Sequence, residues 1–248
     1  MATASLDLGS AVAPPAPRSV GSVSLDLSAP PASPEPSAPT APEPAARSPR
    51  RTAEAAAVPV RRVQSGRPEI LTGKAPVVTL TRLQSGVGAL TITAACSEAV
   101  GDLRLGCAYR LRVGSSSAVQ LESGLTIAPP GTTRPILRAA RERFETVTVD
   151  LRQVREVDRL LFYAFSASGG EIAWGGTLTV TTLGGGRLEI PMDAPKSLGV
   201  TPLATVYNVD GELVVRAEPR EVGPTVREVC LAFGFDRIAW LDPRTPVA

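Results

Sequence analysis

From about residue 75 onward, apolar and polar residues alternate along the sequence with a period of two. Residues 103–113, LRLGCAYRLRV, are the clearest case: every odd-numbered position is apolar, including Cys107, and the even-numbered positions carry Arg104, Arg110 and Arg112. Successive side chains of a β-strand point to opposite faces, so this pattern constrains the segment to a strand. We therefore predict a half-buried strand with Cys107 toward the core and the arginines toward water.

Similar runs predict a chain built almost entirely of strands. Glycine and proline separate the runs, and this spacing indicates an antiparallel β-sandwich rather than alternating strands and helices. Asp210-Gly211 predicts a two-residue hairpin turn, because glycine readily takes the positive φ that such a turn needs. Gly184-Gly185-Gly186 predicts a second hairpin loop. The further runs are 77–82, 89–95, 118–122, 146–151, 159–166, 176–183, 187–191, 202–209 and 212–218.

One helix is predicted close to the end of the chain. Pro224 stands near its start and Gly234 follows as its C-cap. Its apolar stripe is expected to lie across an end or a face of the sandwich, and it is formed by Val222, Val226, Val229, Cys230 and Phe233. Because Cys230 belongs to this stripe, we interpret it as a buried small apolar residue rather than a nucleophile.

The first 72 residues have a different composition, rich in proline, alanine and serine. Half of the 24 prolines fall in the first 60 residues, and such a segment buries too little apolar surface to offset its chain entropy. We predict a disordered arm over 1–72, a β-sandwich domain over 73–242 and a short tail over 243–248. The motif SLDL recurs at 5–8 and 24–27. It is either a chance echo in biased sequence or a pair of docking elements for protein partners.

Several classes of function are disfavoured by composition. The chain has no histidine and three cysteines without C-x-x-C spacing, which removes histidine-based catalysis and makes a zinc cluster or a disulfide framework a poor fit. The net charge of +2 argues against nucleic-acid binding. No apolar run approaches 18 residues and no secretory signal is visible, so we expect no membrane span and a cytoplasmic protein. We expect no enzymatic activity and no cofactor.

Two C-terminal segments resemble the TerD, or tellurium-resistance, domain family. TVTVDLRQVREVDRLLFYAFS (146–166) is similar to the family's V-x-V-D-L strand, turn and strand, and LATVYNVDGELVVRAEPREVGPTVREVCLAFGFD (203–236) is similar to its closing hairpin and helix. The resemblance implies a β-sandwich, roles in tellurite resistance and stress response, calcium binding in many members, and no enzymatic activity.

The residues that bind calcium in that family are largely replaced here. The resemblance places Leu105 and Cys107 where the family has two aspartates, and Arg143 and Phe144 where an acidic loop has two acids. Loss of carboxylates and gain of arginine disfavour calcium. We therefore expect a stress-response binding or scaffold module with degenerate calcium sites, whose arm recruits protein partners.

The alternative is a calcium-binding domain that uses residual acids and backbone carbonyls. Asp102 and Glu145 are the residual metal-site candidates, with Glu122 as a third acid. Asp150 and Asp158 match the family pattern, but they stand at predicted strand ends beside a turn. We interpret them as a turn-capping aspartate and a partner for nearby arginines rather than as metal ligands.

Overall fold

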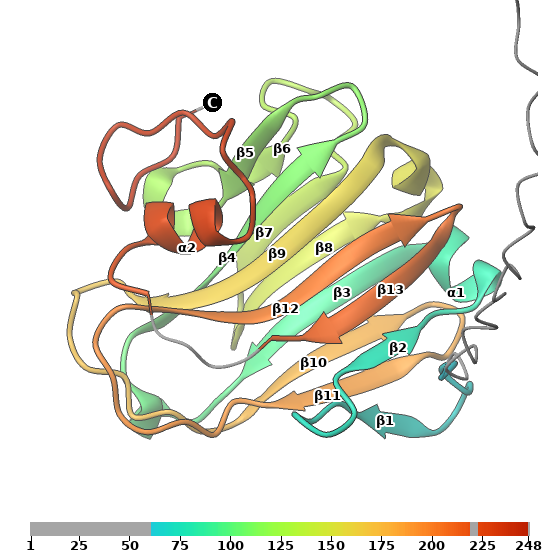
Figure 1. The fold of residues 1–248 in the computed structure, drawn as a ribbon, viewed down its shortest axis with the longest axis horizontal. Coiled ribbons are helices and arrows are strands. Elements are labelled where there is room, and N and C mark those ends of the chain that lie inside the picture. The colour runs from blue at the N-terminus through green and yellow to red at the C-terminus, as the bar shows by residue number, and fades with distance from the viewer. Residues whose placement is uncertain (1–60, 219–222, 248) are drawn as a thin grey trace, which may run out of the picture. The chain divides into compact units, whose positions relative to one another are not determined.

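A computed structural model describes residues 61–218 and 223–247. In this part of the chain the strands form two sheets that pack face to face (Figure 1). The strand order of the seven-stranded sheet is β1 (Pro68–Ile70), β11 (Arg187–Pro191), β10 (Thr177–Thr182), β3 (Ala89–Ala95), β8 (Glu145–Asp150), β7 (Leu137–Arg141) and β6 (Ile127–Ala128). The order of the six-stranded sheet is β2 (Val77–Thr79), β13 (Glu212–Ala217), β12 (Val200–Val209), β9 (Val157–Ser166), β4 (Leu103–Leu111) and β5 (Ser116–Val119).

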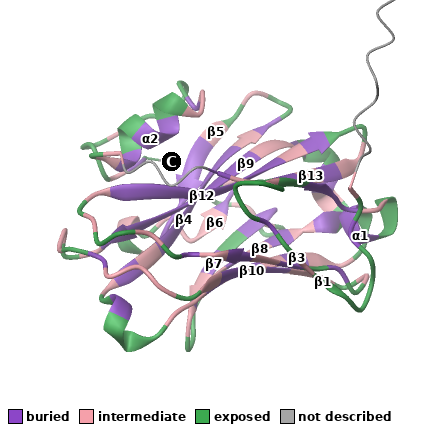
Figure 2. Ribbon diagram, turned by 60° about the horizontal axis from the view of Figure 1, so that its bottom comes forward, coloured by how far each residue is buried: buried purple, intermediate pink, exposed green. Residues whose placement is uncertain are grey.

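The predicted antiparallel β-sandwich is thus present, with one parallel pair, β1–β11, at an edge. Alternation decides which face of each strand lies inside. In β3, Leu90 and Ile92 are fully buried, while Thr91 and Thr93 on the opposite face are half-buried. β8 repeats this pattern with Val147 inside. The main core lies between the sheets, and in Figure 2 much of the ribbon of the central strands is purple, the colour of buried residues.

A second core covers the outer face of the six-stranded sheet. Helix α2 (Val226–Ala232) and the segment after it pack onto β4, β5 and β9. This corrects the prediction that the even-numbered face of residues 103–113 faces water. Gly106 and Ala108 are buried, and Arg104 and Arg110 are only half-buried on either side of them. Val113, predicted on the core side, lies beyond the end of β4 and is 75% exposed.

Both predicted hairpins are confirmed. Asp210 and Gly211 connect β12 to β13 with φ of 51° and 84°, as a two-residue turn with positive φ at both positions requires. Gly185, at φ 77°, turns the chain between β10 and β11. The predicted C-terminal helix is also present, and its Cys230 is fully buried as expected.

Residues 61–72, which were predicted to belong to the arm, make contacts with the sandwich. Arg62 bridges to Thr79, strand β1 starts at Pro68, and Val63 and Leu71 are buried in the main core. The SLDL motifs and the rest of residues 1–60 lie outside the described residues.

The predicted tail is also part of the fold. Ser117 Oγ donates to the carbonyl of Val247 at 2.9 Å, and Gln120 Nε2 donates to the carbonyl of Arg244 at 2.9 Å. These two hydrogen bonds hold the C-terminal segment against β5 and the residue that follows it. Among the described residues, no helix is long and apolar enough to cross a membrane.

Short elements separate the strands. Helix α1 (Arg82–Gly86) follows β2 and begins at the last residue of the run predicted as the strand 77–82, and Thr81 caps it through two reciprocal hydrogen bonds with Gln84. Three 3₁₀ turns cover Glu98–Val100, Leu121–Ser123 and Leu151–Glu156. The first turn leads into β4 and the second follows β5, so both turns position polar side chains at the same end of the antiparallel β4–β5 pair, opposite its connecting turn.

Candidate functional site

Two of the acids considered as metal ligands, Glu122 and Glu145, lie in one cluster with two arginines. Arg104 on β4 donates to Glu122 in the second 3₁₀ turn, and Arg141 at the end of β7 donates to Glu145 at the start of β8. Arg141 also reaches Glu122, with 3.5 Å between Nη2 and Oε1. We call Arg104, Glu122, Arg141 and Glu145 the arginine–carboxylate cluster. It joins the two sheets, because β4 belongs to one sheet and β7 and β8 to the other.

Glu145 is the buried member of the cluster. Its exposed fraction is 6%, and the strand register places it directly opposite Arg141. Burial raises the pKa of the Glu145 carboxyl above its usual value, although the hydrogen bond and charge of Arg141 and the charge of Arg104 act in the opposite direction. A buried carboxylate without a cation would be costly, and the neighbouring guanidinium groups of Arg141 and Arg104 reduce that cost for Glu145.

Asp102 lies next to this cluster but performs a separate task. Its Oδ1 accepts from Ser166 Oγ at 2.5 Å and its Oδ2 accepts from the Ser168 backbone N–H at 2.6 Å. Burial works to raise the pKa of Asp102, but these hydrogen bonds and the charge of Arg104 outweigh it and lower the pKa. Asp102 thereby ties the start of β4 to the end of β9, and both of its oxygens are already engaged.

The charges of the arginine–carboxylate cluster balance: two arginines face two glutamates. A calcium ion needs six to eight oxygen ligands, and a cation approaching Glu122 or Glu145 would meet a guanidinium group already in contact. Within the described residues, no group of three or more histidine, cysteine, aspartate or glutamate side chains is arranged to hold a metal ion.

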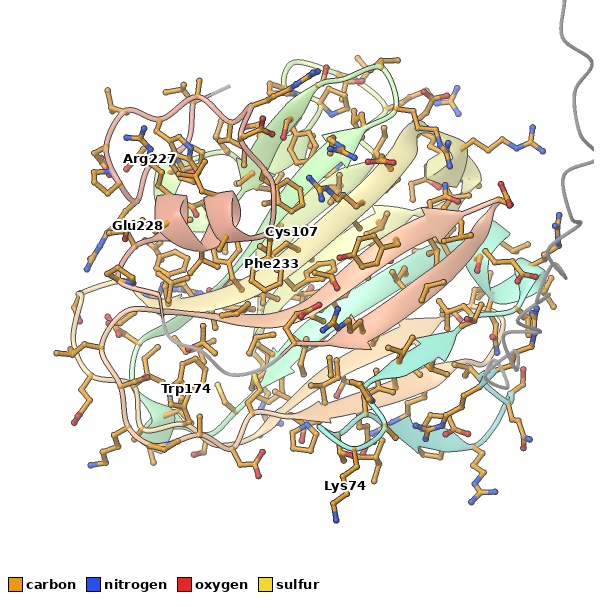
Figure 3. The ribbon with its side chains drawn as sticks, viewed as in Figure 1. Lys74, Cys107, Trp174, Arg227, Glu228 and Phe233 are labelled. Carbon is orange, nitrogen blue, oxygen red and sulfur yellow. The ribbon has the colours of Figure 1, made fainter. Side chains whose placement is uncertain are left out.

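The cysteines lie in surroundings that suppress thiolate formation. Cys107, labelled in Figure 3, is fully buried between the sheets, and burial raises the pKa of its thiol well above the ordinary value. Burial raises the pKa of Cys230 to about 12. Cys96 is half-buried, and burial together with the charge of Glu145 raises its pKa as well. Because the thiolate is the nucleophile, these positions are poor candidates for thiol catalysis.

Asp150 and Asp158 take the structural roles predicted for them. Asp150 caps the 3₁₀ turn Leu151–Glu156 by accepting from the backbone N–H of Arg152, and it also accepts from the side chain of Arg152. Those contacts hold the pKa of Asp150 at about 2. Asp158 on β9 accepts from Arg110 Nε at 2.6 Å, so it is a partner for an arginine of the neighbouring strand.

Sequence reasoning named Arg104 without a partner and missed Arg141, the other arginine of the cluster. Arg141 belongs to β7, which was not predicted, and its partner Glu145 was considered as a ligand on its own. A polar hairpin signal was available: Arg141 and Glu145 are oppositely charged and flank the three residues Glu142, Arg143 and Phe144. No protein-family model matches the chain, and no curated protein matches it either.

Proposed function

We propose that the protein is a non-enzymatic binding or scaffold module, related to the TerD domains of stress response, in which arginines have taken the place of calcium. The proposal keeps the β-sandwich fold and the role in stress response that are implied by the resemblance of residues 146–166 and 203–236. It departs from the family at the ion sites. A β-sandwich alone carries no function, since many unrelated activities share it, so the argument rests on the arginine–carboxylate cluster.

The observation that carries the proposal is the contact of Arg104 with Glu122 and of Arg141 with Glu145. In a calcium site, the carboxylates would converge on a divalent cation. Here each carboxylate faces a guanidinium group, which is part of the protein chain itself. Arg141 links the two sheets at this point, because it contacts both Glu122 and Glu145.

The absence of catalysis is supported by the state of the reactive groups that the structure describes. The thiols of Cys107 and Cys230 are buried with raised pKa values. The carboxylates of Asp102, Glu145 and Asp150 are each held by hydrogen bonds to serine or arginine groups. A general acid or base needs access to a substrate proton, and these groups are occupied inside the protein.

The proposed partners are proteins that bind the N-terminal arm, with the SLDL motifs as docking elements. The test is a pull-down that compares the full chain with a chain lacking residues 1–54, the boundary at which the contacts divide the chain into two units. Loss of specific partners on truncation supports recruitment by the arm. Recovery of the same partners by both proteins means that the arm is only a linker.

The ion-site part of the proposal is tested by thermal unfolding of the full chain with calcium chloride or with a chelator. A ligand that binds the folded state raises the melting temperature in proportion to its saturation. We expect the same melting temperature in both conditions. A large calcium-dependent rise would instead favour a calcium-binding domain that uses Asp102, Glu122 and Glu145.

A further inference from the structure

The outer face of the seven-stranded sheet carries a groove that the proposed function does not use. Its volume is about 850 Å³, a size typical of small-ligand sites. The floor consists of residues from β3, β8, β10 and β7, and one wall is formed by residues 133–136, which precede β7. No member of the arginine–carboxylate cluster lines it.

A single row of side chains crosses the floor of this groove. The strand register places Thr181 of β10 opposite Thr91 of β3, Thr91 opposite Thr148 of β8, and Thr148 opposite Arg138 of β7. Neighbouring strands lie about 4.8 Å apart, so three hydroxyls and one guanidinium group follow one another at regular intervals. The sequence builds the row by alternation, because Leu90 and Ile92 beside Thr91, Val147 and Val149 beside Thr148, and Val180 before Thr181 are buried in the core.

The hydroxyls of this row have no partner within the described part of the protein. Thr91, Thr148 and Thr181 make no side-chain hydrogen bond there, whereas Thr93 and Thr146 in the adjacent row lie 3.4 Å apart and pair with each other. Each hydroxyl both donates and accepts. The row is therefore a series of donor–acceptor groups available to a ligand.

The charge of the groove is positive. Its lining contains Arg134, Arg138, Arg152 and one acid, Asp150, which gives three positive charges and one negative charge. Asp150 is bound to Arg152. Arg134 and Arg138 make no ion pair with any described residue, and both are exposed. Two guanidinium groups are thus available to hold carboxylate or phosphate oxygens, for which their planar fork is suited.

The lining has no aromatic residue. Single-stranded nucleic acids bind largely by stacking their bases on aromatic side chains, and the groove offers no such surface. What it offers is a row of hydroxyls that ends at positive charge. A ligand that matches it carries hydroxyl groups along its length and at least one oxyanion.

We propose that this groove binds an anionic saccharide, a sugar or short oligosaccharide that bears carboxylate or phosphate groups. The sugar hydroxyls pair with Thr181, Thr91 and Thr148, and the oxyanion pairs with Arg138 and Arg134. The inference is independent of the arm and of the ion sites, since it rests on different residues. Its failure would leave the proposed function unchanged.

The test is isothermal titration of the full chain with four probes at matched ionic strength. Trigalacturonate and glucose 6-phosphate combine hydroxyls with carboxylate or phosphate, maltotriose carries hydroxyls alone, and tripolyphosphate carries charge alone. We expect at least one of the two anionic sugars to bind at least about tenfold more tightly than both maltotriose and tripolyphosphate, a difference of roughly 1.4 kcal/mol. If only trigalacturonate binds, the groove is specific for a sugar with carboxylate groups. If only glucose 6-phosphate binds, it is specific for a sugar with a phosphate group. Binding of neither sugar, or equal binding of tripolyphosphate, overturns the proposal.

Matched variants locate the binding. Arg138→Ala and Thr148→Val are each expected to lower the affinity for the anionic sugar by at least about fivefold, because each variant loses one hydrogen bond to the ligand. Arg187→Ala is the charge control, because Arg187 faces Thr181 in the same row but pairs with Glu189 outside the groove. Thr179→Val is the hydroxyl control on the same face. Equal losses in the test and control variants would place binding elsewhere and contradict the proposal.

Discussion

Arg141 and Glu145 face each other across the β7–β8 hairpin, and the guanidinium group of Arg141 supplies the positive charge beside the buried Glu145 carboxylate. The same guanidinium group reaches Glu122, which is also bound by Arg104 on the opposite sheet. A position at which a carboxylate could have received a metal ion is thereby closed by a side chain of the protein itself.

Removing the side chain of Arg141 should destabilise the fold, because the buried Glu145 carboxylate loses its partner. We expect Arg141→Ala to lower the free energy of unfolding by about 1–3 kcal/mol at pH 7, since a buried carboxylate loses its partner. Arg141 is 40% exposed, and solvent screening keeps the loss below that of a fully buried pair. The measurement is urea unfolding, and the double variant Arg141→Ala/Glu145→Gln should recover part of the loss.

This loss should depend on pH with a definite sign. Burial raises the pKa of Glu145, and without Arg141 the pKa should rise further. Between the unfolded and folded pKa values, the folded state then binds more protons, so its stability falls as pH increases. The difference between wild type and Arg141→Ala should therefore be smaller at pH 4 than at pH 7. A difference that is constant with pH would show that Arg141 contributes packing rather than charge.

Gly106 should tolerate no side chain. It lies in the middle of β4, where the ring of Tyr163 packs directly over its backbone, and a methyl group there would collide with that ring. Tyr163 cannot move freely, because its hydroxyl donates to Gln120 Oε1 at 2.8 Å in the second core. We expect Gly106→Ala to destabilise the fold by at least about 1–3 kcal/mol, the usual cost of overpacking.

The matched control for this variant is Gly73→Ala. Gly73 has open space where a Cβ would be placed, and its φ is not positive. Substitution there should change the denaturation midpoint little, as at most surface positions. A Gly106→Ala protein as stable as Gly73→Ala would mean that Tyr163 is not packed over β4.

The three cysteines should differ in their reaction with a thiol reagent. Cys96 is half-buried, whereas Cys107 and Cys230 are fully buried with strongly raised pKa values. We expect Cys96 to be labelled first in the native protein, and Cys107 and Cys230 to be labelled at the rate of unfolding. Mass spectrometry of the labelled peptides identifies each site. Rapid native labelling of Cys107 would revive a thiol-based activity for this strand.

The boundary of the folded unit is open to a direct comparison of two truncations. Removal of residues 1–54 leaves the described structure complete, whereas removal of residues 1–72 deletes β1 and the buried side chains of Val63 and Leu71. Each buried aliphatic side chain stabilises the fold by about 1.5–3 kcal/mol. The protein that lacks residues 1–72 should therefore have a free energy of unfolding that is lower by about 3–6 kcal/mol. It should unfold at a lower urea concentration than the protein that lacks residues 1–54. Equal stability would place the boundary at residue 73, as its composition predicted.

Most of the sheet core could be predicted because its strands combine alternation with clear turns. The runs 89–95 and 187–191 coincide with β3 and β11 residue for residue. β7 could not be predicted in this way. Its inward positions hold Leu137 and the small Ala139, and it is followed by a charged turn, so the alternation has little contrast. Helix α1 lies between two predicted strands and was not predicted, although Thr81 and Gln84 form a capping box at its start.

The partners of the candidate acids could not be predicted, because they depend on which strands become neighbours. Glu122 lies 18 residues from Arg104 and 19 from Arg141, and nothing local in the sequence joins them. The same limit applies to the groove. Its row of Thr181, Thr91, Thr148 and Arg138 comes from four strands whose order in the sheet differs from their order in the chain.

The central claim, that arginines have replaced calcium, is tested most directly by isothermal titration of the full chain with calcium chloride. Calcium sites of folded domains range from nanomolar to about millimolar dissociation constants. The account predicts no saturable heat up to about 1 mM calcium, because Arg104 and Arg141 already pair with Glu122 and Glu145. A stoichiometric site with a sub-millimolar dissociation constant would contradict it.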